Sequence, residues 1–448
     1  MTVPPSQLPH APGPDPTEMA ARGARFTPNP LDLLPQLQRA YGDVVRLDGV
    51  PGEQGGYLIS DPALIEFVHV NTGRLFDKGY LQPGSPMGLV FGGGLIVSEG
   101  DFWLRQRRMV QPSFHRERIR GYGEVMLASV RRLLTGWQPG ETRDLHHDLM
   151  HVTLEIILKS LFDLEAGSEA EAFGQAMDDM LDSITDLYRA TPETAPLIQA
   201  RFEGATRHID DFTRGVIGTR RAQGGDRGDL LSMLLAAQDD EQRGMTEGQL
   251  LDESKNLIMA GHETTSNTLS WTLWLLARHP EAEARLHAEL DEALGGRAPE
   301  VADAERLPYA RNVIQEAMRV MPPVWSVGRR ARQDLELGGY FVPEGAMLSM
   351  SQWVVQRDGR FFPDPLAFTP ERWADGLERR LPRYAYFPFG GGPRVCIGEN
   401  FARMEAVLLL ASIAQRYRLR LPEGETVTAE PSITLRPRGG LKMVLEAR

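Results

Sequence analysis

The stretch Phe389-Gly390-Gly391-Gly392-Pro393-Arg394-Val395-Cys396-Ile397-Gly398 decides how this chain is interpreted. It holds the only cysteine in 448 residues, so no intramolecular disulfide can form. Because the glycines leave almost no side-chain bulk, a large flat ligand can lie against the backbone of the loop. A helix-like segment follows, and a sulfur at a helix N-terminus gains from the free N–H groups and the dipole there. The stretch therefore favours a metal-bound thiolate at Cys396.

The spacing of Phe389, Gly392, Arg394, Cys396 and Gly398 resembles the haem-ligand signature of the cytochrome P450 monooxygenases. This resemblance implies haem b as cofactor, with Cys396 as the axial ligand of the iron and with electron donation that favours O–O cleavage. The alternative reading is that a lone cysteine is only a small buried hydrophobe. The chain has no Cys-x-x-Cys-His sequence, which excludes covalent attachment of haem.

The composition fits this reading and excludes several others. A hydrophobic fraction of 42% predicts a globular chain with a sizeable core, and a net charge of −12 argues against nucleic acid as the main partner. A single cysteine fits a reducing compartment and excludes a zinc-ribbon or disulfide scaffold. Neither a signal-peptide pattern nor an apolar run of membrane-spanning length is present, so we expect a cytoplasmic protein.

The order of sequence patterns predicts a mainly α fold with a small β-rich lobe. We expect a proline-rich extended leader over residues 1–20 and a single catalytic domain over residues 21–448. Helical patterns dominate from residue 62 to about residue 322, and Gln223 to Gly228 reads as a surface loop. The β patterns are a hairpin of Asp43–Asp48 with Gly56–Ser60, a stretch from Leu335 to Met350 and a last one from Arg418 onward.

A long helix is predicted from about Thr246 to Arg278. Thr246 and Gln249 form a capping box at its start, and Pro280 prevents the helix from continuing. Its second half is apolar nearly all round, which indicates burial on several sides. By the resemblance, this is the long central helix of the P450 fold.

The middle of this helix, Ala260 to Thr265, is poor helix chemistry. Gly261 costs about 1 kcal/mol relative to alanine, and two adjacent threonines add crowding. We therefore expect the segment to open the helix locally and to admit a diatomic ligand. The resemblance implies that Thr264 hydrogen-bonds the dioxygen and that Glu263 helps to deliver protons.

The segment has two alternative readings. A threonine-rich polar stripe could face a neighbouring helix. The zinc-protease motif His-Glu-x-x-His begins at His262-Glu263 but fails, because Ser266 occupies the position of the second histidine. His262 is accordingly expected to be structural or to line a cavity.

Further motifs carry the resemblance over nearly the whole chain. Glu316 and Arg319, spaced i to i+3 on one helix face, match the Glu-x-x-Arg helix of the family, and Arg372 in Pro370-Glu371-Arg372-Trp373 matches its Pro-Glu-Arg segment. The resemblance implies that Glu316, Arg319 and Arg372 form a buried structural charge network. A departure is Gln356, where histidine is common in the family.

The resemblance also assigns partners to the two carboxylates of haem: Trp103, Arg107, Arg329 and Arg394. The neighbouring Arg105 and Arg108 are not expected to touch haem, and with Arg107 they would make a positive patch that steers an acidic electron donor; a solvated basic helix is the alternative. No flavin or iron–sulfur module is recognisable, so electrons are expected from a ferredoxin or flavodoxin with its NAD(P)H reductase.

The substrate pocket that the resemblance implies is mostly apolar. It would be lined by Leu89, Phe91, Leu95, Leu257, Ala260, Val324, Trp325, Val327, Ile433 and Leu435. Such a lining favours a bulky, weakly polar substrate, a terpenoid, a carotenoid-like polyene or a fatty acid, although apolar residues at these places could equally be core.

We therefore expect a haem-thiolate monooxygenase that uses dioxygen and two externally supplied electrons. A peroxide-driven haem-thiolate enzyme is an alternative, against which Glu263 and Thr264 speak. A haem sensor or carrier without turnover is another. A cysteine hydrolase would need a base oriented against Cys396, and no sequence feature announces one.

Overall fold

The computed structural model describes residues 4–15, 29–47, 55–79, 86–165, 167–187, 190–239 and 241–448. The chain divides into two compact units. Unit 1 comprises Met1–Gln82, Arg319–Ala367 and Asp375–Cys396, and unit 2 comprises Pro83–Met318, Phe368–Ala374 and Ile397–Arg448. The expected single catalytic domain over residues 21–448 stays a prediction.

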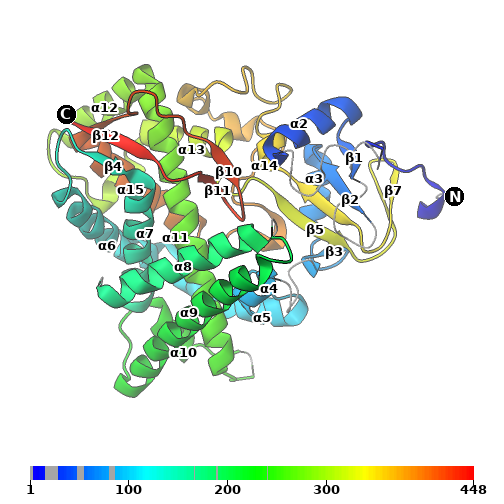
Figure 1. Cartoon of the computed structure of the whole chain (residues 1–448), viewed down its shortest axis with the longest axis horizontal. Helices are drawn as coiled ribbons and strands as arrows, with labels where there is room; N and C mark the ends of the chain where they lie inside the picture. Colours follow the sequence, from blue (N-terminus) through cyan, green and yellow to red (C-terminus); the bar gives the residue numbers. More distant parts are fainter. Residues whose placement is uncertain are drawn as a thin grey trace. The chain divides into compact units, whose positions relative to one another are not determined.

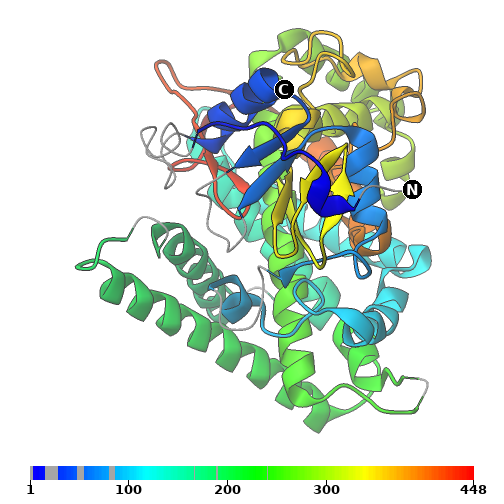
Figure 2. The same ribbon diagram turned by 90° about the vertical axis from the view of Figure 1, so that its right-hand side faces the viewer.

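Unit 1 is built on a five-stranded sheet with the order β1-β2-β8-β5-β3. Figure 2 shows the N-terminal strands in blue beside the later ones in yellow. Strand β2 pairs in parallel with β8, and the other neighbours are antiparallel. The elements of this unit are α2 (Pro30–Tyr41), β1 (Val44–Leu47), β2 (Gly56–Ile59), α3 (Pro62–Val70), β3 (Phe76–Asp77), β5 (Val327–Ala331), β6 (Leu335–Leu337), β7 (Tyr340–Val342), β8 (Met347–Met350) and α14 (Gln352–Val355).

The predicted hairpin is confirmed, because β1 and β2 pair antiparallel from Val44 opposite Ile59 to Leu47 opposite Gly56. Buried side chains of the sheet, among them Tyr57, Phe76 and Leu348, make one apolar core. Most of the loop between the two strands lies outside the described residues.

The start of the chain packs against unit 1. The N–H of Arg46 donates to the carbonyl of Pro12 at 2.8 Å, and the N–H of Phe341 donates to the carbonyl of Pro9 at 2.9 Å. A short 3-10 helix occupies Pro5–Gln7. The other residues of the range 4–15 are not helical. The other parts of the expected leader, residues 1–3 and 16–20, lie outside the described residues.

Unit 2 is mainly helical (Figure 1). Its strands form a three-stranded sheet, β4-β12-β9, and the pair β10-β11. The helices are α4 (Pro86–Phe91), α5 (Gly100–Val110), α6 (Arg116–Thr135), α7 (Leu145–Phe162), α8 (Ser168–Leu187), α9 (Ala195–Gln223), α10 (Leu230–Ala236), α11 (Glu247–Arg278), α12 (Pro280–Leu294), α15 (Glu399–Arg416) and all but the last two residues of α13 (Pro308–Val320). The strands are β4 (Thr142–Asp144), β9 (Tyr417–Arg420), β10 (Ala429–Pro431), β11 (Leu435–Pro437) and β12 (Lys442–Ala447).

The predicted long helix is α11, and its ends are as expected. The hydroxyl of Thr246 accepts the N–H of Gln249 at 3.3 Å, and the side chain of Gln249 accepts the N–H of Thr246 at 2.8 Å. The helix ends at Arg278, and α12 begins at Pro280. Helix α11 packs against α7, α9 and α15 and is buried along most of its 32 residues.

The expected local opening of this helix is not observed, because α11 is unbroken from Glu247 to Arg278. The glycine has a different reason. A Cβ atom at Gly261 would lie 2.5 Å from Cδ1 of Ile157 on α7, which is closer than real Cβ contacts come. Gly261 therefore allows α7 and α11 to approach closely, and its helix cost of about 1 kcal/mol is offset by that packing.

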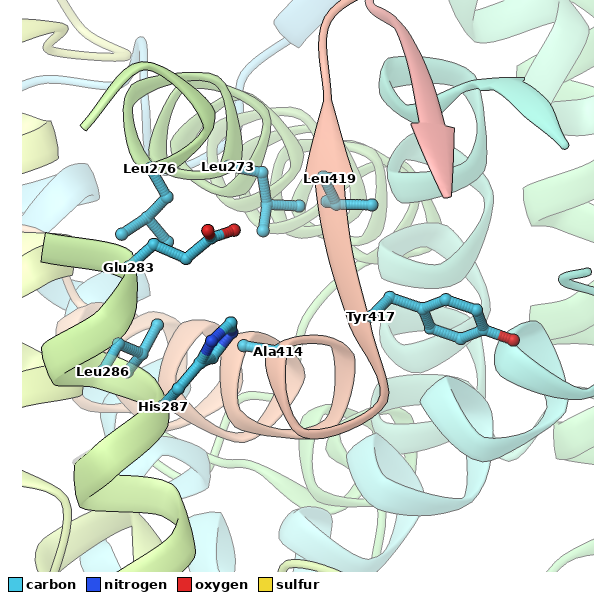
Figure 3. Close-up of a pocket in the computed structure, with 8 residues that line it drawn as sticks. All are labelled: Leu273, Leu276, Glu283, Leu286, His287, Ala414, Tyr417 and Leu419. Atoms are coloured by element: carbon cyan, nitrogen blue, oxygen red, sulfur yellow. The ribbon is translucent and has the colours of Figure 1, made fainter. Parts of the chain in front are cut away.

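A small cavity lies between α11, α12, α15 and β9 (Figure 3). Its volume of about 10 Å³ leaves room for about one water molecule. Its lining is mostly apolar, and Figure 3 shows the side chains of Glu283 and His287 among the apolar ones. It is far too small for a bulky organic molecule, so it is a packing defect and not a substrate site.

Candidate active site

The glycine loop of unit 1 rests on the end of α3. A Cβ atom at Gly392 would lie 2.3 Å from the carbonyl oxygen of His69, and one at Gly391 would lie 2.3 Å from the hydroxyl of Tyr384. Gly392 also has a φ of +63°, which favours glycine. His69 is buried and stacks on Tyr384 with ring centroids 5.1 Å apart. The loop is thus held from one side by contacts that admit only hydrogen at these positions.

Cys396 itself is exposed, and its N–H donates to the carbonyl of Phe389 at 3.0 Å. A free cysteine is ordinarily among the most buried residues, so the reading of Cys396 as a small core hydrophobe is wrong. Helix α15 begins at Glu399, shortly after it in the chain. The loop presents a thiol on an accessible surface next to glycines, which suits a flat ligand bound through sulfur.

Unit 2 contributes an accessible patch in the middle of α11. Ala260 is exposed, Gly261 and Thr264 are partly exposed, and the residues that flank them on the helix are buried. The hydroxyl of Thr264 donates to the carbonyl of Ala260 at 2.7 Å. A polar hydroxyl therefore lies at an accessible point in the mostly buried middle of α11, where a small ligand can reach it.

The neighbouring carboxylate is buried and held by two donors. Oε1 of Glu263 accepts from the hydroxyl of Thr434 at 2.5 Å and from Nε of Arg436 at 2.5 Å. Burial alone would raise the pKa of Glu263, but Arg436, Thr434 and His262 together lower this pKa below its ordinary value. The charge network continues, because Nη1 of Arg436 lies 3.3 Å from the carboxylate of Asp182 on α8.

Arg436 was missed in the sequence. It lies on β11 near the end of the chain, 173 residues after Glu263, and no motif marks it. Its partners on α8 behave differently from Glu263: burial raises the pKa of Asp178 to about 6 although Arg436 opposes the shift. Arg436 therefore acts to lower the pKa of a deeply buried acid on α11 and of less buried acids on α8.

The comparisons with known proteins agree with this chemistry. The profile described as "Cytochrome P450" matches residues 10–443. The chain belongs to the cytochrome P450 family. Cyclooctatin synthase of Streptomyces melanosporofaciens is 37% identical over 98% of this chain and 96% of its own length. Pentalenene oxygenase of Streptomyces avermitilis is 32% identical over 91% and 89%, respectively.

Solved structures show the same fold. The crystal structure of the cytochrome P450DA heme domain matches with a TM-score of 0.87 and 28% identity over 98% of both chains. The retinoic acid-bound cyanobacterial CYP120A1 matches with a TM-score of 0.85 and 23% identity over 99% of this chain and 100% of that one. The mainly α fold with a small β-rich lobe is thereby confirmed.

Membership of the P450 family makes this chain an oxidoreductase of the monooxygenase type with haem b as cofactor. The residues present fit that group: an accessible thiol, a glycine-rich loop beside it in the chain, and an accessible hydroxyl on α11. A P450 also needs a substrate and a source of electrons. No helix among the described residues is long and apolar enough to cross a membrane, and no cluster of three or more His, Cys, Asp or Glu side chains there could hold a metal ion.

The predicted partners of the haem carboxylates occupy both units. Arg329 of unit 1 is buried, and its Nε donates to the hydroxyl of Thr72 at 3.1 Å. Arg394, also of unit 1, is partly buried, as are Trp103 and Arg107 on α5 of unit 2. Their roles toward haem stay predictions.

The expected positive patch on α5 needs a correction. Nε of Arg105 pairs with Asp239 at 2.7 Å, and its Nη2 donates to the carbonyls of Arg243 and Gly244. The charge of Arg105 is therefore compensated within unit 2. Its hydrogen bonds connect α5 to the loop before α11. Because Asp239 compensates the charge of Arg105, this arginine adds little to a positive patch on the helix. Arg108 is exposed.

The structure brings Glu316 and Arg372 together. Glu316 has no exposed surface, and its Oε1 accepts from Nε of Arg372 at 2.9 Å. The same carboxylate accepts the N–H of Thr369 at 2.9 Å and the indole N–H of Trp373 at 2.8 Å. The buried carboxylate thus has three hydrogen-bond donors, which offset the cost of removing it from water.

Arg319, which belongs to unit 1, is equally buried and bonds to backbone oxygens. Its guanidinium donates to the carbonyls of Gln356, Pro365 and Ala367 at 2.7–2.8 Å. Gln356 also has a clear role: its side chain accepts the N–H of Phe387 at 3.1 Å and donates to the carbonyl of Arg319 at 3.3 Å. The departure from histidine therefore keeps one acceptor and one donor at a structural position.

The ten predicted pocket residues divide between accessible and buried positions. Ala260 is exposed, and partial exposure is seen at Val324, Trp325, Val327 and Ile433. The structure buries Leu435 completely, and its backbone carbonyl accepts the indole N–H of Trp271 at 2.8 Å, so it is a core residue. The nearly buried residues are Phe91, Leu95 and Leu257. The side chain of Leu89 lies outside the described residues.

Proposed function

We propose that this P450 oxidises a terpenoid hydrocarbon or a weakly polar terpenoid. The observation that carries the proposal is the accessible Ala260–Thr264 face of α11, where a hydroxyl stands next to an alanine and a glycine. Such a surface has room for a small reactant, and it offers a bulky substrate no charge to pair with. The named relatives cyclooctatin synthase and pentalenene oxygenase act on terpenoids, which supports this class over fatty acids or carotenoid-like polyenes.

In this proposal Cys396 holds the haem iron through its thiolate, and haem supplies the activation of dioxygen. Thr264 would position the oxygen reactant by a hydrogen bond from its hydroxyl, and Glu263 would hold and pass a proton at Oε1. Trp103, Arg107, Arg329 and Arg394 would bind the haem carboxylates, and Phe389 and Gly398 would border the flat ring. Their residue types support these assignments.

Two electrons per turnover would come from a ferredoxin or a flavodoxin with its NAD(P)H reductase, in the cytoplasm. The single cysteine of the chain supports a reducing compartment. A peroxide-driven enzyme would need no electron donor. Comparing product formed with a ferredoxin system and with hydrogen peroxide alone separates the two cases.

The test of the proposal has two stages. The purified protein, reduced with dithionite and exposed to carbon monoxide, should show the strongly red-shifted Soret band of thiolate-ligated haem, and Cys396→Ser should lose this band. The wild-type protein is then titrated with cyclic terpenes, polyenes and fatty acids, and the shift of the Soret band gives the affinity. Tight binding of fatty acids and none of terpenes would overturn the substrate class without touching the thiolate assignment.

A further inference from the structure

The loop before α5 is bonded through its backbone to side chains of α11. The N–H of Gly93 donates to Asp252 at 2.7 Å, the N–H of Leu95 donates to Glu253 at 3.1 Å, and the N–H of Ile96 donates to Asn256 at 3.0 Å. These contacts join residues about 160 positions apart in the chain. We call the three α11 side chains, Asp252, Glu253 and Asn256, the clasp.

The clasp also holds the carbonyl side of the loop. Nδ2 of Asn256 donates to the carbonyl of Phe91 at 2.6 Å, so this one amide group bonds both ends of the segment from Phe91 to Ile96. Glu253 and Asn256 are almost completely buried. Nε2 of Gln106 on α5 donates to the second oxygen of Glu253 at 3.1 Å. Buried hydrogen bonds of this kind fix geometry, because leaving one unmade costs about 1–3 kcal/mol.

Glycines allow the loop to lie this close. A Cβ atom at Gly92 would come within 2.1 Å of the Asp252 carboxylate, and one at Gly94 would come within 2.3 Å of the Asn256 amide. Gly92 also has a φ of +57°. The sequence Phe91-Gly92-Gly93-Gly94-Leu95 is therefore matched to the clasp: its backbone lies on α11, and the two flanking apolar side chains are buried.

Within the loop the clasp bonds only main-chain atoms, so it sets the position of the loop and does not depend on the side chains of Phe91 and Leu95. The same helix carries Ala260 and Thr264 one to three turns further on. We propose that Asp252, Glu253 and Asn256 are positioning residues for substrate recognition, which hold the apolar residues Phe91 and Leu95 as a wall at a fixed distance along α11 from Thr264. The inference rests on the proposed function in one respect, that Phe91 and Leu95 face the substrate.

The first experiment uses the holoenzyme and hydrogen exchange. In Asn256→Ala the amide of Ile96 should exchange at least about tenfold faster than in the wild type, because Asn256 loses both the acceptor for that N–H and the donor to the carbonyl of Phe91. Ser254→Ala is the matched control: it is on the same buried stretch of α11, and its hydroxyl has no hydrogen bond among the described residues. Unchanged exchange in Asn256→Ala would overturn the clasp.

The second experiment tests the wall without knowledge of the substrate. Imidazole and 4-phenylimidazole both bind haem iron through nitrogen. Only 4-phenylimidazole has an apolar ring that can pack against Phe91 and Leu95. In Asn256→Ala the ratio of the two affinities should fall by about tenfold while imidazole binds as before. Faster exchange with an unchanged ratio would mean that the clasp is only structural, and would overturn the positioning role.

If Asn256→Ala folds poorly, two variants of Glu253 replace it: a conservative one, Glu253→Gln, and one that removes the acceptor, Glu253→Leu. Glu253→Gln should keep both the loop amide protection and the ligand ratio, because its amide oxygen can accept from Leu95. Gln106, whose Oε1 is buried without a hydrogen bond, can then turn to accept from the new amide. Glu253→Leu should lose both. Terpenes that fail to bind the wild type would refute the substrate class alone, since neither measurement uses a terpene.

Discussion

Glu263 and Arg436 form a buried ion pair in which Nε of the arginine lies 2.5 Å from Oε1 of the carboxylate. The pair joins the middle of α11 to strand β11, and both side chains are largely enclosed. Arg436 also reaches Asp182 on α8 at 3.3 Å. The acid that is proposed to handle protons is therefore kept ionised by one arginine, whose other carboxylate partner is more exposed to solvent.

Arg436→Met should raise the pKa of Glu263, because burial then acts on the carboxyl without the compensating cation. The stability that the ionised Glu263 contributes is present above its ordinary value of 4.5 and is lost as the pH falls below it. We therefore expect the variant to be less stable than the wild type at pH 7.5, by about 3–5 kcal/mol, and the deficit to shrink towards pH 4.5. Thermal unfolding across this range measures it.

The matched control for this variant is Arg438→Met, which removes a more exposed arginine two residues further along the chain, paired with Glu430. It should change stability by less than about 1 kcal/mol at any pH. A deficit of Arg436→Met that is equal at pH 7.5 and pH 4.5 would contradict the assignment of the ion pair as its cause.

Glu405 on α15 should make the wild-type protein less stable as the pH rises. Burial raises the pKa of Glu405 to about 8, although the hydroxyl of Thr265 opposes the shift. The contact with Thr265 is not a well-formed hydrogen bond, and neither carboxyl oxygen makes one among the described residues. Between pH 4.5 and pH 8 the unfolded chain loses this proton while the folded chain keeps it, so the free energy of unfolding decreases.

Glu405→Gln keeps the shape and removes the titration, so its Tm should exceed that of the wild type at pH 8 and approach it at pH 5. Differential scanning calorimetry at the two pH values measures the difference. Glu399→Gln, on the same helix and paired with Arg403, serves as the control and should show no such pH-dependent gain. Parallel pH profiles for wild type and Glu405→Gln would show that Glu405 does not titrate in this range.

Thr264→Ala should keep haem and the thiolate spectrum but lower the product formed per NAD(P)H consumed, with hydrogen peroxide released instead. The expected loss is about 10²-fold or less in the rate of product formation, since one positioned proton-transfer group is removed. Thr268→Ala is the control one turn further along α11. Its hydroxyl donates to the carbonyl of Thr264 at 2.8 Å in the same way, but the residue is buried. Equal coupling in both variants would remove the assignment of Thr264.

The sequence predicted those parts of the fold that local chemistry determines. The start of α11 was predictable, because Thr246 and Gln249 satisfy each other within one turn. The function of Gly261 was not, because its reason is the side chain of Ile157 on another helix. Helix propensity suggested an opening where close packing keeps the helix intact.

The candidate site shows the same division. Cys396 could be predicted as a candidate haem ligand because the residues that indicate it are consecutive in the chain, and this role stays a prediction. Arg436 and the clasp were missed, because each pairs side chains with groups about 160 or more positions away, and one partner in the clasp is main chain. A side chain that bonds to a backbone N–H leaves no pattern in the partner's residue type.

Glu316→Gln should destabilise the fold and lose haem with it, and should leave the spectrum of the remaining holoenzyme unchanged. The carboxylate accepts from Arg372, Thr369 and Trp373, and an amide would turn its NH₂ group against at least one of these donors. We expect a loss of about 3–5 kcal/mol, measured by denaturant unfolding together with haem content. Glu371→Gln, in the neighbouring and more exposed pair with Arg285, should cost less than about 1 kcal/mol. A stable Glu316→Gln protein with altered haem spectra would mean that Glu316 acts on the cofactor and not on the fold.

Gly392→Ala and Gly390→Ala separate two reasons for glycine in the glycine loop, the positive φ and the close approach to another segment. Both residues have positive φ, +63° and +69°, so alanine costs each about 1–2 kcal/mol of backbone strain. Only at Gly392 would the new Cβ collide with backbone, 2.3 Å from the carbonyl oxygen of His69; at Gly390 the nearest atom, on the ring of the same histidine, is 4.0 Å away. Gly390→Ala should therefore keep the thiolate band with carbon monoxide and lose only stability. Gly392→Ala should displace the loop from α3 and lose haem or its thiolate ligation. If both variants keep the band equally well, the contact between Gly392 and His69 does not set the position of Cys396.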